Sequence, residues 1–372
     1  MKIESIRFTW TTLFDVSAHN QPHPGTNPRP TLADVAKRAG VSGSTASIAF
    51  SGDGSISAKT RDRVLAAADE LNYAGPDPRA RSLRQGRSGI VGVILEDRVL
   101  HSFRDPMLVA ALDGISQQLG ESGGMLLLTS NGEGESTIQT AVFDAAIFMG
   151  CSPHLARSIE VMRQRNVPMV AIEGQAFDGV LSVALDNREA SVTLARVVHD
   201  LGHRRVATIT LPLDSLRELR PLTEELVRSA TTAASLDRLE GCREVYPGLT
   251  GFVATNSSTD EGMAAALRLL DAAPELRPTA IIAQSDLLAL GAIRAAESLG
   301  LRVPGDLTVV GFDGARIEGM NDYDLTTMVQ PAMEKGRAAG FAVTELLAGR
   351  DAGDVSLTSV LHIGNTSGPV PQ

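Results

Sequence analysis

After Gly89 the sequence alternates between short apolar runs and longer stretches with helical spacing. Most of the apolar runs are four to six residues long and rich in Val, Ile and Leu, which is typical of strands buried on both faces. The predicted strands are Ile90–Leu95, Met125–Leu128, Ala145–Met149, Met169–Ile172, Val206–Ile209, Ala280–Ala283 and Leu307–Val310. Helical stretches such as Arg188–Leu201 and Asp286–Leu299 separate them. This alternation predicts an α/β body over residues 89–372 with doubly wound parallel sheets, and its length predicts two lobes.

Before Gly89 the apolar positions follow helical spacing alone. They predict a small all-α head over residues 31–74, with helices at Leu32–Ala39, Gly43–Phe50 and Ala58–Leu71. Thr31 and Ser57 stand where N-caps are expected. In the third helix one face should be apolar, formed by Val64, Leu65, Ala68 and Leu71.

Two segments outside the head and body have no such periodicity. Residues 1–30 carry prolines at positions 22, 24, 28 and 30, so we expect a disordered arm there. Residues 75–88 are rich in Gly, Pro, Ser and Arg, and we expect a linker that contains one short hinge helix.

Charge is distributed unevenly along the chain. The net charge is −10, yet the stretch from Arg29 to Arg87 holds ten basic and six acidic residues, which is +4. A basic head on an acidic body favours contact between the head and a polyanion. The alternative is uneven surface charge without functional meaning.

Several classes of protein are disfavoured by composition. The two cysteines, Cys151 and Cys242, imply neither a disulfide framework nor a cysteine-rich zinc site, and they fit a reducing cytoplasm. No apolar run approaches the roughly 18 residues of a membrane span, and no secretory signal is expected. His199 and His203 have the spacing of two metal ligands, but no third ligand is evident. We therefore expect no metal, no cofactor and, because no phosphate loop or nucleophile–base set occurs, no enzymatic activity.

Three small residues in the head have the spacing of a helix-turn-helix. Ala36 allows the second helix to cross closely, Gly40 permits the left-handed backbone of the turn, and Ala46 faces inward. The start of the second helix carries short polar groups suited to base edges and phosphates, namely Ser42, Gly43, Ser44, Thr45 and Ser47. The alternative is a generic helical hairpin.

These segments resemble the LacI/GalR family of bacterial repressors. The resemblance lies in TLADVAKRAGVS (31–42), SAKTRDRVLAAADELNY (57–73), ARSLRQGRS (80–88) and the long block at 280–314. It implies a periplasmic-binding-protein-like body, a homodimer, a pseudo-palindromic double-stranded DNA operator and a small metabolite, a sugar or a related molecule, bound between the lobes. Residues expected at the DNA are Thr31, Ser42, Gly43, Ser44, Thr45, Ser47, Ile48, Ser57, Lys59, Thr60, Arg81, Leu83 and Arg84.

In this family a leucine of the linker helix wedges into the minor groove, and the matching residue is Leu83, flanked by Arg81 and Arg84. An ordinary linker whose leucine docks on the body is the alternative. The chain departs from the family at Ile48, where an arginine is common, so that Ile48 either meets a thymine methyl or packs inward. The segment Ala74-Gly75-Pro76 is also one residue longer than is common.

Three residues of the body are candidates for binding the metabolite. Asp286 follows the strand Ala280–Ala283 and so lies at a carboxyl end, where ligands bind in open α/β sheets, although it could simply cap the next helix. Arg238 falls where the family places an effector-binding arginine, and Glu173 ends another strand. For Asp313 we expect a structural turn role. The resulting hypothesis is a metabolite-controlled repressor in the cytoplasm, and the alternative is a soluble small-molecule (sugar) binding protein without a DNA role.

Overall fold

The computed structural model describes residues 30–51, 55–76, 86–96, 103–120, 124–129, 135–150, 152–320 and 322–371. The chain divides into two units, Met1–Gly86 and Arg87–Gln372, which we describe separately. The predictions for the arm and for Arg81, Leu83 and Arg84 concern residues outside the described ranges. Among the described residues no helix is both long enough and apolar enough to cross a membrane.

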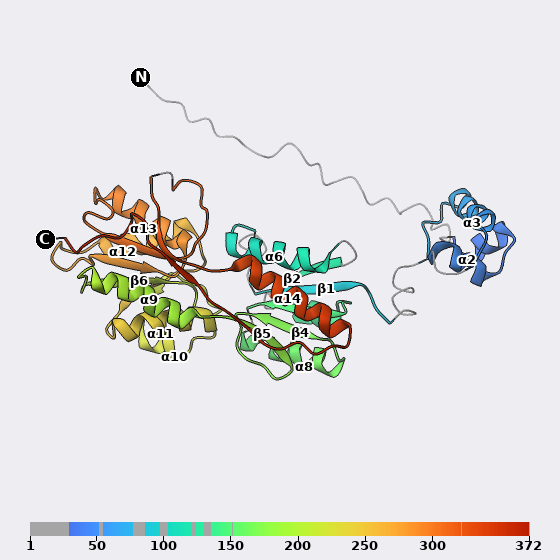
Figure 1. Cartoon of the computed structure of the whole chain (residues 1–372), viewed down its shortest axis with the longest axis horizontal. Coiled ribbons are helices and arrows are strands. Elements are labelled where there is room, and N and C mark those ends of the chain that lie inside the picture. The colour runs from blue at the N-terminus through green and yellow to red at the C-terminus, as the bar shows by residue number, and fades with distance from the viewer. Residues whose placement is uncertain are drawn as a thin grey trace, which may run out of the picture. The chain divides into compact units, whose positions relative to one another are not determined.

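The head is built from the three predicted helices, α1 (Leu32–Ala39), α2 (Gly43–Ser51) and α3 (Ala58–Glu70), drawn in blue in Figure 1. Its small core is mostly alanine and valine. The buried members are Val35, Ala36, Ala39, Ala46, Ala49, Val64, Ala67 and Ala68. Leu65 was predicted to face this core but is 39% exposed, because Ala67 takes the inward position on α3.

The first lobe of the body has a six-stranded sheet in the order β12-β5-β4-β3-β1-β2, and every pairing in it is parallel. Helices α6 and α14 pack on one face of this sheet, and α7 and α8 pack on the other. The strands are β1 (Ile90–Leu95), β2 (Gly124–Thr129), β3 (Ala145–Met149), β4 (Met169–Ile172), β5 (Val180–Leu185) and β12 (Val355–Leu357). The helices are α6 (Pro106–Leu119), α7 (Glu135–Thr140), the 3-10 helix η2 (Pro153–Leu155), α8 (Ala156–Gln164) and α14 (Ala332–Leu347).

The second lobe has a seven-stranded sheet in the order β13-β11-β10-β9-β6-β8-β7. Its five central strands are parallel, and the two edge strands, β7 and β13, are antiparallel to their neighbours. The strands are β6 (Val206–Thr210), β7 (Arg220–Pro221), β8 (Thr250–Val253), β9 (Ala280–Ala283), β10 (Thr308–Asp313), β11 (Thr326–Val329) and β13 (Val360–His362). The helices are α9 (Asn187–Asp200), α10 (Glu224–Arg228), α11 (Ala233–Val245), α12 (Thr259–Leu270) and α13 (Asp286–Ser298).

The doubly wound α/β prediction is therefore confirmed, since α9 and α11 cover one face of the second sheet while α12 and α13 cover the other. The sequence reading missed β5, β8 and β11, whose Ser, Thr and Gly residues interrupt the apolar pattern, and the short strands β7, β12 and β13. Such strands are defined by the neighbour with which they pair more than by their own hydrophobicity.

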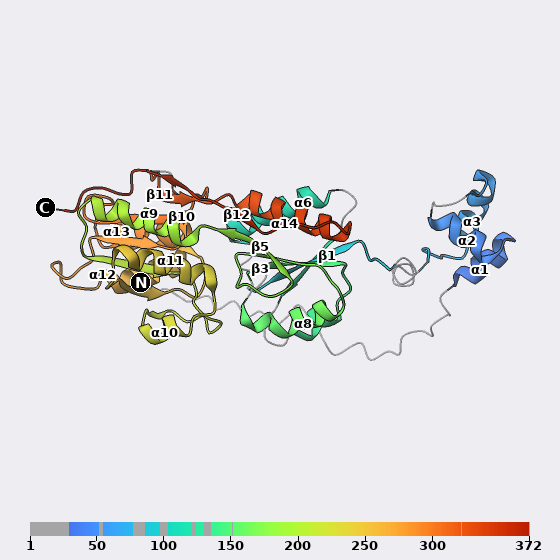
Figure 2. The ribbon, with the colours of Figure 1, turned by 60° about the horizontal axis from the view of Figure 1, so that its bottom comes forward.

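The chain crosses between the lobes three times. It passes from β5 to α9, from β11 to α14 and from β12 to β13, so that both lobes contain discontinuous segments (Figure 2). α14 returns to the first lobe and lies beside α6, as Figure 1 shows. Three segments of the chain therefore connect the two lobes.

The contact between α6 and α14 depends on glycines. A Cβ atom on Gly336 of α14 would stand 1.9 Å from the carbonyl oxygen of Ala111, and one on Gly114 of α6 would stand 2.1 Å from that of Met333. Real Cβ atoms do not approach backbone that closely, so the two helix backbones touch where side chains would normally hold them apart.

This contact predicts the effect of a single methyl group. Gly336→Ala should lower the free energy of unfolding by about 2–3 kcal/mol, because the helices must separate to accommodate the Cβ atom. Helix propensity alone would make the same substitution stabilising by about 1 kcal/mol. Urea denaturation shows whether Gly336→Ala lowers or raises the free energy of unfolding. Gly353→Ala, whose Cβ atom would meet nothing within 4 Å, is the control; equal stability of the two variants would contradict the close packing.

Candidate DNA-binding head and interlobe cavity

The two helix starts predicted to be capped in the head are capped by hydroxyls. The Thr31 hydroxyl accepts a hydrogen bond from the amide of Asp34 at 3.3 Å, and the Asp34 carboxylate accepts from the amide of Thr31 at 2.8 Å. This reciprocal capping box holds the pKa of Asp34 below its usual value. Ser57 accepts from the amide of Thr60 at the start of α3. Both predicted N-caps are confirmed, and each is formed by residues of the head itself.

The turn between α1 and α2 has the geometry that its small residues predict. Gly40 adopts a left-handed conformation with φ of 66°, and the amide of Val41 donates to the carbonyl of Ala36 at 3.0 Å. Ala36 and Ala46 are buried where α1 and α2 meet. A residue with a Cβ atom would be strained at Gly40 although space is available, so the requirement there is conformational.

The start of α2 presents hydroxyls and backbone to the surface. Ser42, Gly43 and Ser44 are exposed, and Ser47 and Ile48 are half-buried. Ser42 accepts from the amide of Thr45 at 3.1 Å, and its hydroxyl lies within hydrogen-bonding distance of those of Ser44 and Thr45. The Ser42 hydroxyl therefore caps α2, and the hydroxyls of Ser44 and Thr45 lie beside it.

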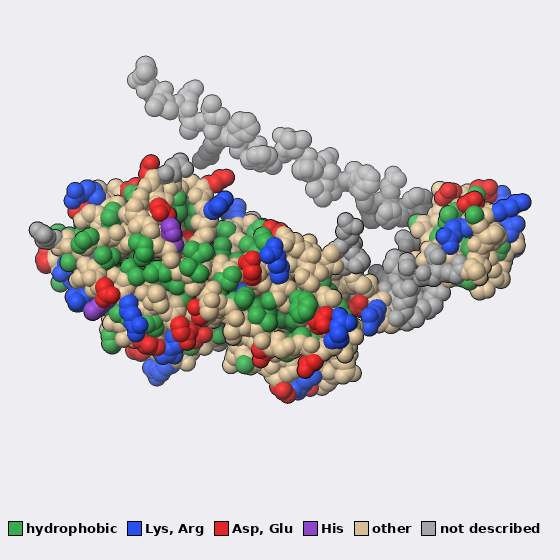
Figure 3. Space-filling model, viewed as in Figure 1, with side chains coloured by type: hydrophobic (Ala, Val, Ile, Leu, Met, Phe, Trp, Pro, Cys, Tyr) green, Lys and Arg blue, Asp and Glu red, His purple; other side chains and the backbone are tan. Residues whose placement is uncertain are grey.

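Ile48 is outside the core of the head. It lines a shallow groove with Leu32 and Ala33 of α1 and with Gly43, Ser44 and Ser47 of α2. No residue of α2 is charged, so the cations of the head come from other elements. Lys37, Arg38, Lys59 and Arg63 are exposed on α1 and α3, and Figure 3 shows Lys and Arg side chains on the surface of the head.

A cavity of about 270 Å³ lies between the two lobes of the body. Glu173 reaches it from the end of β4 with a backbone φ of 52°, a conformation that is uncommon for a residue other than glycine. Its carboxylate accepts a hydrogen bond from the Asn187 side chain of the second lobe at 2.7 Å and from the ammonium of Lys335 on α14. Burial alone would raise the pKa of Glu173, but the charges of Lys335 and Arg238 outweigh it and lower the pKa to about 2.

Arg238 lines the same cavity from α11 and is held on several sides. Its guanidinium donates to the Asn187 side chain and to the carbonyl of Gln284, each at 2.7 Å, and lies 3.8 Å from the ring centroid of Phe312. One of its nitrogens is 3.8 Å from the Glu173 carboxylate, which belongs to the other lobe. The structure thus brings together two of the three predicted effector residues, Glu173 and Arg238.

Asp313 has more than the turn role expected for it. It ends β10, lines the interlobe cavity, accepts a hydrogen bond from Gln330 at 2.6 Å and lies 3.6 Å from Arg238. Burial raises the pKa of Asp313 well above its usual value; Arg238 opposes this rise, and the carboxylates of Asp286 and Asp105 reinforce it.

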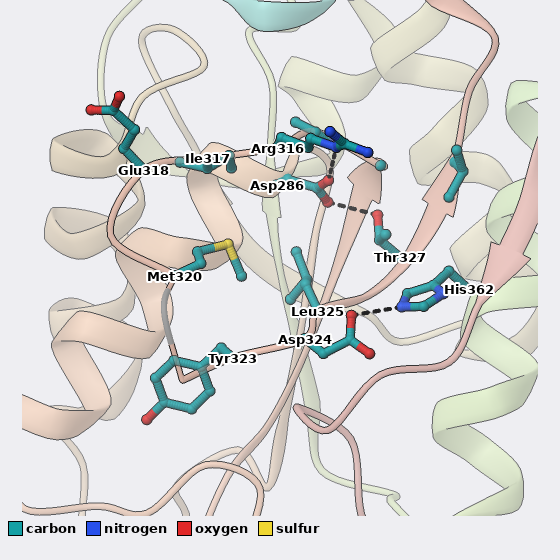
Figure 4. A pocket seen from close by; sticks show the side chains of 13 residues that line it. Asp286, Arg316, Ile317, Glu318, Met320, Tyr323, Asp324, Leu325, Thr327 and His362 are labelled. Atoms are coloured by element: carbon teal, nitrogen blue, oxygen red, sulfur yellow. Dashed lines mark hydrogen bonds and ion pairs between the residues drawn. The ribbon is translucent and has the colours of Figure 1, made fainter.

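Asp286, the third predicted effector residue, lines a different cavity (Figure 4). Ser285 provides the N-cap of α13, and the Asp286 carboxylate instead accepts from the hydroxyl of Thr327 at 2.6 Å and from the amide of Ala315 at 2.7 Å. Burial raises the pKa of this carboxyl to about 6, against the hydrogen bonds from Thr327 and Ala315. These bonds fasten the loop after β10 to α13 and to β11.

The sequence did not single out several polar residues that line the interlobe cavity: Glu96, Asp105, Gln330, Lys335 and the hydroxyl-bearing Thr232, Ser235, Ser257 and Ser285. Glu96 and Asp105 follow β1, and the Asp105-Pro106 pair that begins α6 was a readable helix-start signal. Lys335 lies in a stretch with an amphipathic helical pattern. Nothing in the sequence indicates that it is buried, with only 4% of its surface exposed.

The two histidines with metal-ligand spacing do not share a site. The ring of His203 is buried and hydrogen-bonded to the Thr279 hydroxyl and to the carbonyl of Gly368, whereas His199 lies beside Asp200.

Two family models match the chain. Residues 31–75 match the model of bacterial regulatory proteins of the lacI family, and residues 195–366 match that of a periplasmic binding protein-like domain. The first match covers the head with its helix-turn-helix, and the second covers most of the second lobe and α14.

Relatives and solved structures resemble the chain over nearly its whole length. It is 30% identical to the HTH-type transcriptional regulator IpsA of Corynebacterium glutamicum over 91% of this chain and 98% of that protein. It is 29% identical to the HTH-type transcriptional repressor CytR of Escherichia coli K12 over 88% of this chain and 92% of CytR. The structure of the Lac repressor dimer bound to operator and the anti-inducer ONPF superposes with a TM-score of 0.67 at 25% identity, covering 91% of this chain and 99% of the repressor. The chain therefore belongs to the LacI family of DNA-binding transcriptional regulators.

Proposed function

We propose that this regulator binds a pseudo-palindromic operator as a homodimer and represses transcription, and that a small metabolite bound between the lobes changes its operator affinity. The observation that supports this most directly is the combination on one chain of a helix-turn-helix head and a body whose lobes meet at a charged cavity. A binding protein without a DNA role would have no use for the head.

The head offers two kinds of DNA contact. Base edges would meet the surface of α2, whose candidate residues are Ser42, Gly43, Ser44, Thr45, Ser47 and Ile48. The half-buried position of Ile48 in a surface groove, outside the core of the head, favours contact with a thymine methyl group over inward packing. Phosphates would meet the helix starts at Thr31, Ser57, Lys59 and Thr60, and Arg81, Leu83 and Arg84 of the linker remain candidates for the minor groove.

The body has a route by which a ligand could act on the linker. Ser88 and Gly89, at the end of the linker, donate three hydrogen bonds of 2.7–2.9 Å to Asp144, so the linker is tied to the first lobe. The Glu173 carboxylate of that lobe is bound by Asn187 and faces Arg238, both in the second lobe. A ligand that changes these contacts shifts one lobe against the other and moves the point at which the linker is anchored.

The first prediction concerns the reading surface of α2. Ser44→Glu should weaken operator binding at least tenfold, about 1.4 kcal/mol, because the carboxylate faces phosphates. The same charge in the first turn of a helix should stabilise α2 slightly. Fluorescence anisotropy with labelled operator measures the first effect and thermal unfolding the second. Ala273→Glu, an equal charge on the surface of the body, is the control; equal operator affinities of the two variants would contradict the assignment of α2.

The second prediction concerns the assembly. One head makes too few contacts for useful specificity, and a two-fold dimer matches a two-fold operator. Sedimentation at micromolar concentration should show a dimer, and DNA with one half-site destroyed should bind at least a hundredfold more weakly than the intact site. A monomer in the presence of operator would refute the dimer.

The third prediction concerns the coupling between metabolite and operator. Selection of genomic fragments identifies the operator, and its affinity is then measured across a metabolite library. At least one compound should change that affinity by 5–150-fold, corresponding to about 1–3 kcal/mol of coupling. The response should disappear in Ala234→Trp, whose indole occupies the cavity that Ala234 lines, and persist in Ala273→Trp. A full response in Ala234→Trp would place the ligand elsewhere.

A further inference from the structure

The charges that line the interlobe cavity do not balance. Four carboxylates and two cations face it: Glu96, Asp105, Glu173, Asp313, Arg238 and Lys335. Both cations already contact Glu173, so that this carboxylate is compensated within the protein. The excess negative charge therefore lies on the other acids.

Two of the acids that remain are Asp313, which is buried, and Asp105, which is half-buried. Asp105 comes from the first lobe, where its Oδ1 atom caps α6 by accepting from the amides of Met107 and Leu108. Asp313 comes from the second lobe and is 7% exposed, and its Oδ1 atom accepts from Gln330. Among the described residues no group donates a hydrogen bond to the Oδ2 atom of either. Each aspartate therefore has one carboxylate oxygen without a hydrogen-bond donor among the described residues. The two aspartates line the cavity from opposite lobes.

The nearest cation is shared among several acceptors. Arg238 forms an ion pair with Asp313 at 3.6 Å, but the same nitrogen donates a hydrogen bond to the carbonyl of Gln284 at 2.7 Å. The guanidinium also lies within 4 Å of Glu173 and packs on Phe312. Burial raises the pKa of Asp105 and of Asp313, because removal from water disfavours the ionised form of a carboxyl group. Uncompensated buried carboxylates are costly unless a partner of opposite charge is supplied.

The remainder of the wall limits the size and kind of ligand. At about 270 Å³ the cavity is just below the usual range for drug-sized ligands, which starts near 300 Å³. Its described lining contains no aromatic ring on which a nucleobase could stack, but it includes the hydroxyls of Thr232, Ser235, Ser257 and Ser285. These groups suit a small, hydroxyl-bearing or aliphatic molecule.

We propose that the metabolite carries a protonated amine, which binds between Asp105 of the first lobe and Asp313 of the second. An ammonium group can donate hydrogen bonds to the Oδ2 atoms of both aspartates. Its positive charge also offsets the repulsion between these two carboxylates, which belong to different lobes. An amino sugar or a small aliphatic amine fits this site, whereas a sugar phosphate or a carboxylate would add to the unfavourable charge. The inference rests on the proposed function, since it names the class of ligand for the same cavity.

The carboxylates can be tested without any ligand. At pH 7 Asp105→Asn and Asp313→Asn should each raise the melting temperature of the full chain by roughly 2–4 °C, because a neutral isostere removes an uncompensated charge. The pKa of each aspartate is raised in the folded chain, so the stability gained by substituting asparagine should vanish below about pH 4. There the aspartate is protonated in the folded and unfolded chains alike. Asp113→Asn, on the exposed face of α6, is the control and should change nothing. Lower melting temperatures for both test variants would overturn the proposal.

The ligand class is tested with matched probes that differ in charge. Glucosamine, glucose and glucose 6-phosphate form one set, and putrescine, 1,4-butanediol and succinate form another. At millimolar concentration the amine of at least one set should raise the melting temperature of the protein. The affinity of the protein for this amine should fall at least tenfold in Asp105→Asn and in Asp313→Asn. It should not change in Asp113→Asn. Absence of any amine-dependent shift, or an equal shift with the neutral or anionic member, would overturn the inference. Operator binding by the same samples without probe is measured in parallel, so that failure of the proposed DNA function is distinguishable from failure of the ligand class.

Discussion

Glu173 is the carboxylate around which the charged groups at the junction of the lobes are arranged. It stands at the end of β4 in an uncommon backbone conformation and is bound by Asn187 and Lys335, with Arg238 within 4 Å. Removing one partner of a buried ion pair costs about 3–5 kcal/mol, so these groups depend on one another. Because Asn187 and Arg238 belong to the other lobe, the same contacts that neutralise Glu173 also set how the lobes meet.

The packing of α6 on α14 determines where the other charges of the cavity lie. Asp105 caps the first of these helices, and Lys335 is next to Gly336, the residue at which the two backbones touch. A contact between backbones leaves little freedom to slide, so the same pair of helices places both charges in the first lobe. The second lobe carries Asp313 at the end of β10 and Arg238 on α11. The wall of the cavity is therefore assembled from two groups of charges, one on each lobe.

The head is stabilised by interactions of a different kind. Its core consists largely of alanine and valine. Thr31 and Ser57 specify where two of its helices begin through local hydrogen bonds, and Gly40 specifies the turn through its backbone conformation. These interactions are formed within the head itself. In the body, Ser88 and Gly89 are hydrogen-bonded to Asp144, which fixes the chain just before β1. The helix-turn-helix and the interlobe cavity therefore lie in separate segments of the chain.

The sequence alone was sufficient for whatever depends on local periodicity and local hydrogen bonds. The three helices of the head, both N-caps, the left-handed turn at Gly40 and the apolar strands β1, β2, β3, β4, β6, β9 and β10 were predicted within a residue or a few, because near neighbours in the sequence determine them. The less apolar strands β5, β8 and β11 and the short strands β7, β12 and β13 were not, since pairing with strands elsewhere in the chain defines them. For the site, Glu173 and Arg238 were correct choices for the cavity wall, but Asp286 follows a strand just as Asp313 does, and the rule that ligands lie beyond strand ends could not separate them. Only the tertiary structure decided that Thr327 and Ala315 occupy the carboxylate of Asp286, while Asp313 and Asp105 line the interlobe cavity. Burial and partnership are properties of the packed lobes and not of the strand order.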